Sequence, residues 1–253
     1  MLLDDKSVLV TGASRGIGRA IALEAARQGA DVALVARSAD DLRAVADEVR
    51  GSGRRGVGIV ADVGRPREAR RVVQEALDAL GRVDVLVNCA GTGIGPVPVE
   101  ETTDEQWQTI LDTNLNGPWW LVQALAPHLT ARGSGAIVNV SSLGAKYKPG
   151  ATSAAYTASK SALSGLTRQL AMLLGPKGIR VNAILPGNTV LERPDASWAS
   201  LSEEDKERML HDIPLGRFGT PEDQARAAVW LASDYNTWVT GENLAVAGGE
   251  RMG

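Results

Sequence analysis

The chain has 253 residues, of which 44% are hydrophobic and 23% are charged, and its formal net charge is −3. This length and composition suit one large α/β domain or two small ones, and the mildly negative charge argues against nucleic acid or an anionic membrane as a partner. One cysteine, Cys89, excludes an internal disulfide, and two distant histidines without Cys or carboxylate partners at ligand spacing predict no metal site.

The first residues carry charges where a signal peptide needs an apolar core. No apolar run approaches the roughly 18 residues that a membrane span requires. We therefore expect a soluble, cytoplasmic protein.

Short runs rich in Val, Ile and Leu alternate with longer segments of helical period. The predicted strands are Ser7–Thr11, Asp31–Ala36, Gly56–Ala61, Asp84–Asn88, Ala136–Ser141, Arg180–Leu185 and Asn243–Ala247. The predicted helices are Gly16–Gln28, Ala39–Arg50, Arg67–Leu80, Asp104–Arg132, Tyr156–Leu174 and Pro221–Ser233. Strict β-α alternation predicts an α/β fold, a doubly wound parallel sheet of about seven strands with helices on both faces. Since no linker or repeat interrupts the chain, we expect one domain over residues 1–253.

A glycine-rich turn follows the first predicted strand and opens a helix. Its glycines are Gly12, Gly16 and Gly18. Glycines at this place allow a tight turn and a close approach of backbone N–H groups to a pyrophosphate, which the helix N-terminus also attracts. The turn predicts a dinucleotide site at the carboxyl ends of the strands.

The end of the second strand, about 20 residues further on, is where the adenosine ribose is read. The strand ends in Ala36-Arg37-Ser38, with no carboxylate for the ribose hydroxyls of NAD. Arg37 can instead pair with a 2′-phosphate, and Arg15 in the glycine turn can reach the same group. We therefore expect NADP(H) as the preferred cofactor, with NAD(H) as the alternative. Ser38 and Asp41 fit a helix capping box.

Later strand ends carry further polar and small residues. Asp62 is placed to hydrogen-bond the adenine amino group, and Ala90-Gly91 lets backbone lie against the cofactor. Cys89 is interpreted as a small buried filler. Asn114 lies in Asn114-Leu115-Asn116-Gly117, which interrupts the long helix with polar and flexible residues, so a specific hydrogen bond is expected there.

Tyr156 and Lys160 are four residues apart in a predicted helix, so both side chains lie on one face. A phenol has an unperturbed pKa of about 10, and a nearby ammonium favours its phenolate, which makes the pair a tunable acid and base. Ser142 follows the fifth strand and can hydrogen-bond the same substrate oxygen. Ser141 is the weaker alternative.

In these motifs the chain resembles the short-chain dehydrogenase/reductase family over nearly its whole length, from Thr11 to Gly249. The motifs, in order, are Thr11-Gly12-x-x-x-Gly16-x-Gly18, Asn88-x-Ala90-Gly91, Asn114, Ser142, Tyr156-x-x-x-Lys160 and Pro186-Gly187. The resemblance implies that Tyr156 is the general acid that protonates a carbonyl oxygen as hydride arrives, and that Ser142 polarises this carbonyl. It further implies that Lys160 binds the nicotinamide ribose and lowers the tyrosine pKa, and that Asn114 fixes a water of a proton relay.

The resemblance also implies a set of cofactor contacts. They are Gly12, Ser14, Arg15, Gly16, Ile17, Gly18, Arg37, Ser38, Asp62, Val63, Asn88, Ala90, Gly91, Tyr156, Lys160, Pro186, Gly187 and Thr189.

Four departures from the family pattern stand out. Cys89 replaces an asparagine, and Ser142 precedes Tyr156 by fourteen residues where thirteen is commoner. After Pro186-Gly187 the family usually has an isoleucine or valine and a threonine two residues later, whereas this chain has Asn188-Thr189-Val190-Leu191, which leaves the contact with the nicotinamide amide open. Ala247 stands where an aspartate is frequent.

Substrate choice in this family lies in the least regular segments, here 92–99, 143–153 and 189–215. The last contains Pro194, Trp198 and a charged stretch, 202–208, that predicts a short mobile lid helix over the substrate. Trp198 is a candidate substrate contact, whereas Trp119, Trp120 and Trp230 are interpreted as packing or interface residues. The resemblance implies a homotetramer or homodimer built on the helices 104–132 and 156–174.

The sequence therefore predicts an oxidoreductase that transfers hydride between NADP(H) and a ketone or secondary alcohol, chiefly in ketone reduction. An NAD-dependent secondary-alcohol dehydrogenase is the first alternative, although the missing acidic residue after the second strand counts against it. A cofactor-binding sensor without catalysis is the second. Such a sensor would be free to lose Tyr156, Lys160, Ser142 or Asn114, yet all four are present. The substrate is predicted to be a small carbonyl or alcohol compound.

Overall fold

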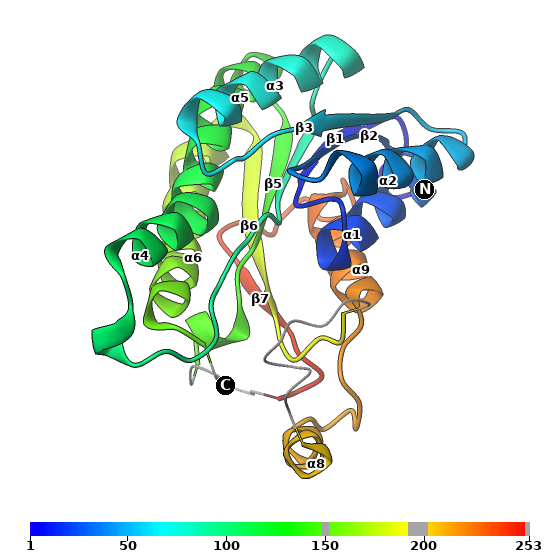
Figure 1. Cartoon of the computed structure of the whole chain (residues 1–253). Coiled ribbons are helices and arrows are strands. Elements are labelled where there is room, and N and C mark those ends of the chain that lie inside the picture. The colour runs from blue at the N-terminus through cyan, green and yellow to red at the C-terminus, as the bar shows by residue number, and fades with distance from the viewer. Residues whose placement is uncertain (148–151, 192–201, 251–253) are drawn as a thin grey trace.

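One parallel sheet of seven strands organises the protein. The computed structural model describes residues 1–147, 152–191 and 202–250. The strands are β1 (Ser7–Thr11), β2 (Asp31–Ala36), β3 (Gly56–Val60), β4 (Val85–Asn88), β5 (Gly135–Val140), β6 (Ile179–Pro186) and β7 (Asn243–Val246). Their order is β3-β2-β1-β4-β5-β6-β7, and every neighbouring pair is parallel (Figure 1). The predicted doubly wound sheet is confirmed. Strand order reverses between β1 and β4, which is where such sheets bind ligands.

Helices cover both faces of the sheet. They are α1 (Gly16–Arg27), α2 (Ala39–Gly51), α3 (Pro66–Leu80), α4 (Asp104–Leu111), α5 (Gly117–Arg132), α6 (Ala154–Leu174), α8 (Glu203–His211) and α9 (Pro221–Ala232). Side chains of α1, α2 and α9 pack on one face, and those of α3, α5 and α6 pack on the other (Figure 1). Val8 and Val10 of β1 belong to the first layer and Leu9 to the second, because successive strand side chains point to opposite faces. Burial of both layers stabilises the fold through the hydrophobic effect.

The long helix predicted over Asp104–Arg132 is two helices joined by a π-helical segment, Asp112–Asn116. The fully buried Asn114 side chain is hydrogen-bonded outside the helix. Gly117 also passes so close to the Val63 carbonyl that a Cβ there would lie only 2.8 Å from the oxygen. Single π turns of this kind occur often at functional sites.

The start of α6 and the capping of α2 differ from the prediction. Helix α6 begins at Ala154 rather than Tyr156, because Ser153 caps it by accepting the N–H of Tyr156 at 3.3 Å. The capping box predicted for Ser38 and Asp41 is wrong. The Ser38 hydroxyl donates to the Asp41 carboxylate at 2.9 Å, and the Ser38 side chain caps no backbone N–H of α2.

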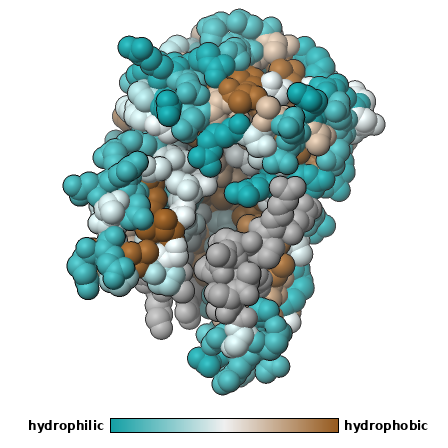
Figure 2. All heavy atoms as spheres, viewed as in Figure 1, coloured by the Kyte–Doolittle hydropathy of each residue, from teal (hydrophilic) through white to brown (hydrophobic). Residues whose placement is uncertain are grey.

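Helix α8 lies in the predicted lid segment. Its N-cap, Ser202, accepts the N–H of Asp205 at 3.1 Å, and none of its residues is buried. The lower end of the molecule in Figure 2, where Figure 1 places α8, is covered by hydrophilic side chains. Pro194 and Trp198, which were predicted to belong to the lid, lie outside the described residues. None of the helices described is long and apolar enough to cross a membrane.

Candidate active site

The glycine turn after β1 is shaped for a close approach of another chain segment. Gly12 has φ +68°, a conformation that favours glycine, and a Cβ there would lie 2.8 Å from the Ala90 Cα. The Thr11 hydroxyl fastens the two segments, since it accepts the N–H groups of Cys89 and Ala90 at 3.0 and 3.1 Å. The turn and the end of β4 therefore form one backbone surface.

The N-terminus of α1 faces this turn without a side-chain cap. Its N-cap residue, Arg15, is exposed, has an extended backbone and accepts no hydrogen bond from the first turn through its side chain. The first N–H groups of a helix lack intrahelical partners, and with the helix dipole they favour an anion. Ser14, Gly16, Ile17 and Gly18, all predicted cofactor contacts, lie in this same turn.

Arg37 and Ser38 lie next to the glycine turn. They follow the last residue of β2, and the Ala13 N–H donates to the Val35 carbonyl at 3.1 Å, which joins the turn to β2. Arg15, Arg37 and Ser38 are all exposed. Two arginines and a hydroxyl therefore border the place where the ribose was expected.

Asp62 and Val63 follow β3. The Asp62 carboxylate accepts the Gly64 N–H at 3.0 Å and lies 3.6 Å from the Arg65 guanidinium. Val63 is buried. The Asp62 side chain is thus held locally, and its contact with an adenine group stays a prediction.

Asn88 is buried between two strands. It lies opposite Asn139 in the register of β4 and β5, and its amide donates to the Asn139 side chain at 2.8 Å. Asn139 in turn donates to the Thr167 hydroxyl at 2.9 Å, which ties both strands to α6. The Asn88 Oδ1 accepts no hydrogen bond from the described residues. Asn88 therefore helps to hold β4, β5 and α6 together.

Lys160 is the buried cation of the site. Its side chain donates to the Val140 carbonyl at 2.7 Å, its Nζ lies 5.8 Å from the centre of the Tyr156 ring, and only 3% of the residue is exposed. Desolvation lowers the pKa of Lys160 to about 8, partly opposed by the nearby Cys89 thiol. The same desolvation raises the pKa of Cys89 to about 12, so its thiol is not a nucleophile near neutrality.

Ser141 and Ser142 play different parts at the end of β5. The Ser141 hydroxyl is buried, donates to the Lys160 carbonyl at 2.8 Å and lies 2.9 Å from the Ser164 hydroxyl. Ser142 is partly exposed at the start of the 3-10 turn Leu143–Ala145, and its Oγ accepts the Gly144 N–H at 3.3 Å. Among the residues the structure describes, none accepts the Ser142 hydroxyl proton. Ser142 is therefore the hydroxyl that is able to donate to a ligand.

The Asn114 amide closes the other side of the site. Its Nδ2 donates to the Thr92 carbonyl and the Ser159 hydroxyl at 2.9 and 3.0 Å, and its Oδ1 accepts the Thr92 N–H at 2.8 Å. A Cβ on Gly91 would lie 3.4 Å from the Lys160 Nζ and 3.5 Å from the Asn114 Oδ1, so these atoms are no more than about 7 Å apart. Because both amide hydrogens of Asn114 are committed, it can hold a relay water only as an acceptor.

Gly93 is a site residue that no sequence pattern predicts. A Cβ at this position would lie 2.9 Å from Cδ2 of the Tyr156 ring. The absence of a side chain at position 93 therefore lets the ring take its place. A glycine in an irregular loop gives no sequence signal of such an approach, because it depends on how the loop meets α6.

The chain after β6 forms the remaining border. Gly187 passes close to β7, since a Cβ there would lie 2.6 Å from the Ala247 Cβ. Thr189 follows it, and the Leu191 side chain reaches the glycine turn, 3.4 Å from where a Cβ of Gly16 would be. The predicted residues from β1, β4, β5, α6 and β6 thus border one site at the carboxyl ends of the strands. No group of three His, Cys, Asp or Glu side chains within the described ranges could hold a metal ion.

Known proteins resemble the chain over nearly its whole length. The model of a family described as enoyl-(acyl carrier protein) reductase matches residues 12–250. The 3-oxoacyl-(acyl-carrier-protein) reductase FabG of Staphylococcus epidermidis is 40% identical over 98% of this chain and 100% of its own length. An L-rhamnose 1-dehydrogenase (NAD(P)(+)) of Azotobacter vinelandii is 43% identical over 98% of both chains.

A solved structure from Beutenbergia cavernae has the same fold as this chain. It is described as a candidate NAD(P)-dependent gluconate 5-dehydrogenase with NADP bound at low occupancy. It superposes with a TM-score of 0.91 at 41% identity, covering 98% of this chain and 97% of its own. The chain therefore belongs to the short-chain dehydrogenase/reductase family, whose members are NAD(P)-dependent oxidoreductases.

Proposed function

We propose that this protein transfers hydride between NADP(H) and a ketone or secondary alcohol, with ketone reduction as its main direction. The observation that carries the proposal is the buried ammonium of Lys160 beside the Tyr156 ring, with the Ser142 hydroxyl at the end of the adjacent strand. A desolvated lysine is costly to bury, so its place one turn from a phenol points to a chemical role. As an acid and base pair the arrangement is useful.

The residues at the carboxyl ends of the strands fit a dinucleotide. The uncapped N-terminus of α1 suits its pyrophosphate. Gly12 allows the close approach of Ala90, and Gly91 lies beside the Lys160 ammonium and the Asn114 amide. Lys160 and Tyr156 would hold the nicotinamide ribose. When bound, the nicotinamide supplies or takes the hydride.

The side chains perform the proton chemistry in this proposal. The Ser142 hydroxyl donates a hydrogen bond to the substrate carbonyl oxygen, where negative charge develops. The Tyr156 hydroxyl gives its proton to that oxygen, and the Lys160 ammonium stabilises the phenolate that remains. A water molecule that donates a hydrogen bond to Asn114 would relay a proton to Lys160, and Lys160 would pass a proton back to Tyr156. In the oxidative direction Tyr156 takes the alcohol proton.

The preference for NADP(H) rests on Arg37 and Arg15. Both side chains are exposed beside the glycine turn, and β2 ends without a carboxylate. Arginine pairs with phosphate through two parallel hydrogen bonds, whereas NAD offers only hydroxyls at this place. The NADP bound in the Beutenbergia cavernae structure supports the same choice. NAD-dependent alcohol oxidation is the alternative, and the NAD(P)(+) in the name of the rhamnose dehydrogenase favours testing it.

We further propose a cytoplasmic homotetramer, or a homodimer, of one oxidoreductase domain over residues 1–253 with a substrate lid at 189–215. Helices α4, α5 and α6 are its expected interface elements. Trp107 and Trp119 on α4 and α5 are each 40% exposed, and Met172 near the end of α6 is 74% exposed, so each offers apolar surface to a second copy.

Turnover of NADPH with a small panel of carbonyl substrates tests the function. The names of the relatives suggest a 3-oxoacyl thioester, a 5-ketosugar acid and, in the oxidative direction with NADP+, a free sugar. Tyr156→Phe should abolish turnover while leaving NADPH binding in place. Tyr235→Phe is a matched control because Tyr235 is 85% exposed beyond α9. Turnover that survives Tyr156→Phe would contradict the proposed chemistry, and binding without turnover of any substrate would favour a cofactor-binding sensor.

A further inference from the structure

A buried amide on α9 links the ends of β6 and β7. Gln224 is 1% exposed, and its Nε2 donates to the Val246 carbonyl at 3.0 Å and to the Thr189 hydroxyl at 3.2 Å. The Val246 oxygen can only accept, so the NH2 group of Gln224 must face it, and both of its hydrogens are used. Its Oε1 accepts no hydrogen bond from the described residues. Both N–H groups of this buried amide are satisfied, whereas burying Oε1 without a hydrogen bond costs free energy.

The Thr189 hydroxyl is left with one lone pair that accepts no hydrogen bond from the described residues. It donates its proton to the Gly187 carbonyl at 3.0 Å and accepts one hydrogen bond, from Gln224. A hydroxyl has one proton and two lone pairs, so a single lone pair of Thr189 stays available. The side chain is therefore prepared to accept a hydrogen bond and not to donate one.

The backbone around this pair is firmly connected. Thr189 forms a bridge with Gly219, in which the Gly219 N–H donates to Asn188 at 2.9 Å and the Val190 N–H donates to Gly219 at 3.0 Å. Gln224 is thereby held close to Thr189 from the adjacent turn of α9.

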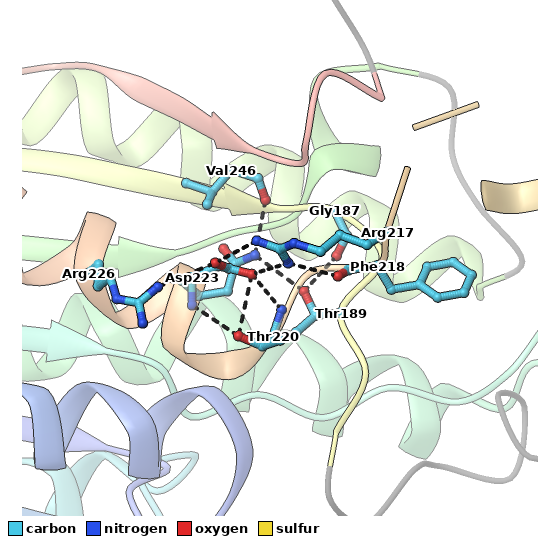
Figure 3. Close-up of polar contacts among 9 residues, drawn as sticks. Gly187, Thr189, Arg217, Phe218, Thr220, Asp223, Arg226 and Val246 are labelled. Carbon is cyan, nitrogen blue, oxygen red and sulfur yellow. Dashed lines mark hydrogen bonds and ion pairs between the residues drawn. The ribbon is translucent and has the colours of Figure 1, made fainter. Parts of the chain in front are cut away.

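An ion pair fixes the start of that helix. Arg217 binds both carboxylate oxygens of Asp223 at 2.6 and 3.0 Å, and Asp223 also forms a capping box with Thr220 (Figure 3). The hydrogen bond from Arg217 is the main reason that the pKa of Asp223 falls to about 2, so the carboxylate is ionised at any physiological pH. The labelled side chains of Arg217, Thr189 and Thr220 converge on Asp223 and its neighbours in Figure 3.

We propose that Gln224 is a positioning residue that holds the Thr189 hydroxyl as the acceptor for an N–H of the nicotinamide carboxamide. The inference rests on the proposed function, because it needs the cofactor in the site. Thr189 follows Pro186-Gly187 at the carboxyl end of β6, and Leu191, two residues later, reaches the glycine turn beside Gly16. A carboxamide N–H is a donor that this acceptor can receive, and the hydrogen bond would fix how the ring is oriented.

Two cofactors test the proposal by binding alone. NADP+ carries the carboxamide, whereas its 3-acetylpyridine analogue has an acetyl group in the same place and no N–H to donate. Dissociation constants for both are measured by quenching of tryptophan fluorescence. The unaltered protein should bind NADP+ about 3- to 10-fold more tightly than the analogue, the range expected for one neutral hydrogen bond.

Variants then show which side chains cause the difference between the dissociation constants of NADP+ and the analogue. Gln224→Leu and Thr189→Val should each reduce it to about 1 by weakening NADP+ and not the analogue, and the double variant should be no worse than either single one. Thr189→Ser, which keeps the hydroxyl, should retain the ratio. Gln74→Leu is the matched control, since Gln74 is an exposed glutamine on α3.

The contradicting results are distinct. Equal affinity of the unaltered protein for the two cofactors would overturn the inference and leave the proposed function standing. Weakening of both cofactors alike by Gln224→Leu would also overturn it, since that would mark a purely structural amide. Binding of neither cofactor by the unaltered protein would overturn the proposed function itself.

Discussion

The Nζ of Lys160 lies 5.8 Å from the centre of the Tyr156 ring and is held there by a 2.7 Å hydrogen bond to the Val140 carbonyl. The cation is thus anchored to the carboxyl end of β5. Its position beside the ring is set before any ligand arrives, which is the preorganisation that electrostatic catalysis requires.

The lowered pKa of Lys160 predicts how stability changes with pH. Because its folded pKa is about 8 and its ordinary value is 10.5, the folded protein releases this proton before the unfolded chain does. Below pH 8 the cost of burying the ammonium is fully present, and it is relieved as the pH rises from 8 to 10.5. The unaltered protein should therefore gain up to about 3 kcal/mol relative to Lys160→Met over this range.

Urea unfolding of both proteins at pH 7 and pH 10 measures this gain. The exposed Lys177→Met is the control and should show no such change. A constant difference between Lys160→Met and the unaltered protein at the two pH values would mean that Lys160 titrates normally.

Gly93 makes room for the Tyr156 ring, so a side chain at position 93 should displace it. A Cβ 2.9 Å from Cδ2 is closer than side chains tolerate, and the ring carries the hydroxyl with it when it moves. Displacements of about 1 Å can cost about 100-fold in rate, so Gly93→Ala should lower kcat by about 10- to 100-fold with little change in the Kd of NADPH. Steady-state kinetics and a binding titration measure the two effects. Gly95→Ala is the control, because a Cβ there would meet nothing within 4 Å. An unchanged kcat in Gly93→Ala would show that the ring adapts without loss.

The adjacent serines should separate activity from stability. Ser142→Ala removes a donor to the substrate oxygen and should lower kcat by about 100- to 1,000-fold without affecting the melting temperature. Ser141→Ala leaves the buried Ser164 hydroxyl and Lys160 carbonyl without this partner, and should destabilise the protein by about 1 to 3 kcal/mol. Kinetics and thermal melting of both variants distinguish the two roles. The reverse pattern would make Ser141 the substrate-facing residue.

Gly12 is expected to be indispensable for the cofactor site. Its φ of +68° strains any other residue, and a Cβ would press on the backbone of Ala90, which cannot yield as a flexible side chain can. Gly12→Ala should therefore weaken NADPH binding by more than about 10-fold and lower the melting temperature. Gly53→Ala has a similar φ of +80° in open space, so it controls for backbone strain alone. Equal effects of the two substitutions on NADPH binding would contradict a special role of the glycine turn.

The sheet was predictable from sequence because its strands are apolar runs that are buried on both faces. Each predicted strand bound lies within one residue of the observed one. The polar break at Asn114 was also predictable, because an asparagine and a glycine stand out in an apolar helix. The π turn that results was not predictable, because it depends on Thr92 and Ser159 binding the Asn114 side chain.

The finer features of the site depend on tertiary placement. The sequence favours Ser142 over Ser141, but only the packing of α6 on β5 buries Ser141 and leaves Ser142 available. Gln224 lies 35 positions from Thr189, and nothing local marks their contact. The same holds for Gly93 and Tyr156. Local patterns can propose Tyr156 and Lys160, whereas the residues that position them appear only in the folded chain.

Selection of NADP(H) through Arg37 can be measured by paired titrations with NADPH and NADH. Tryptophan fluorescence quenching gives both dissociation constants for the unaltered protein, for Arg37→Ala and for Arg43→Ala, an exposed arginine of α2 that serves as the control. We predict that NADPH binds at least about 10-fold more tightly than NADH, and that Arg37→Ala erases the difference whereas Arg43→Ala keeps it. NADH binding as tightly as NADPH to the unaltered protein would rule out a selective role of Arg37 and direct the search for substrates to alcohols in the oxidative direction.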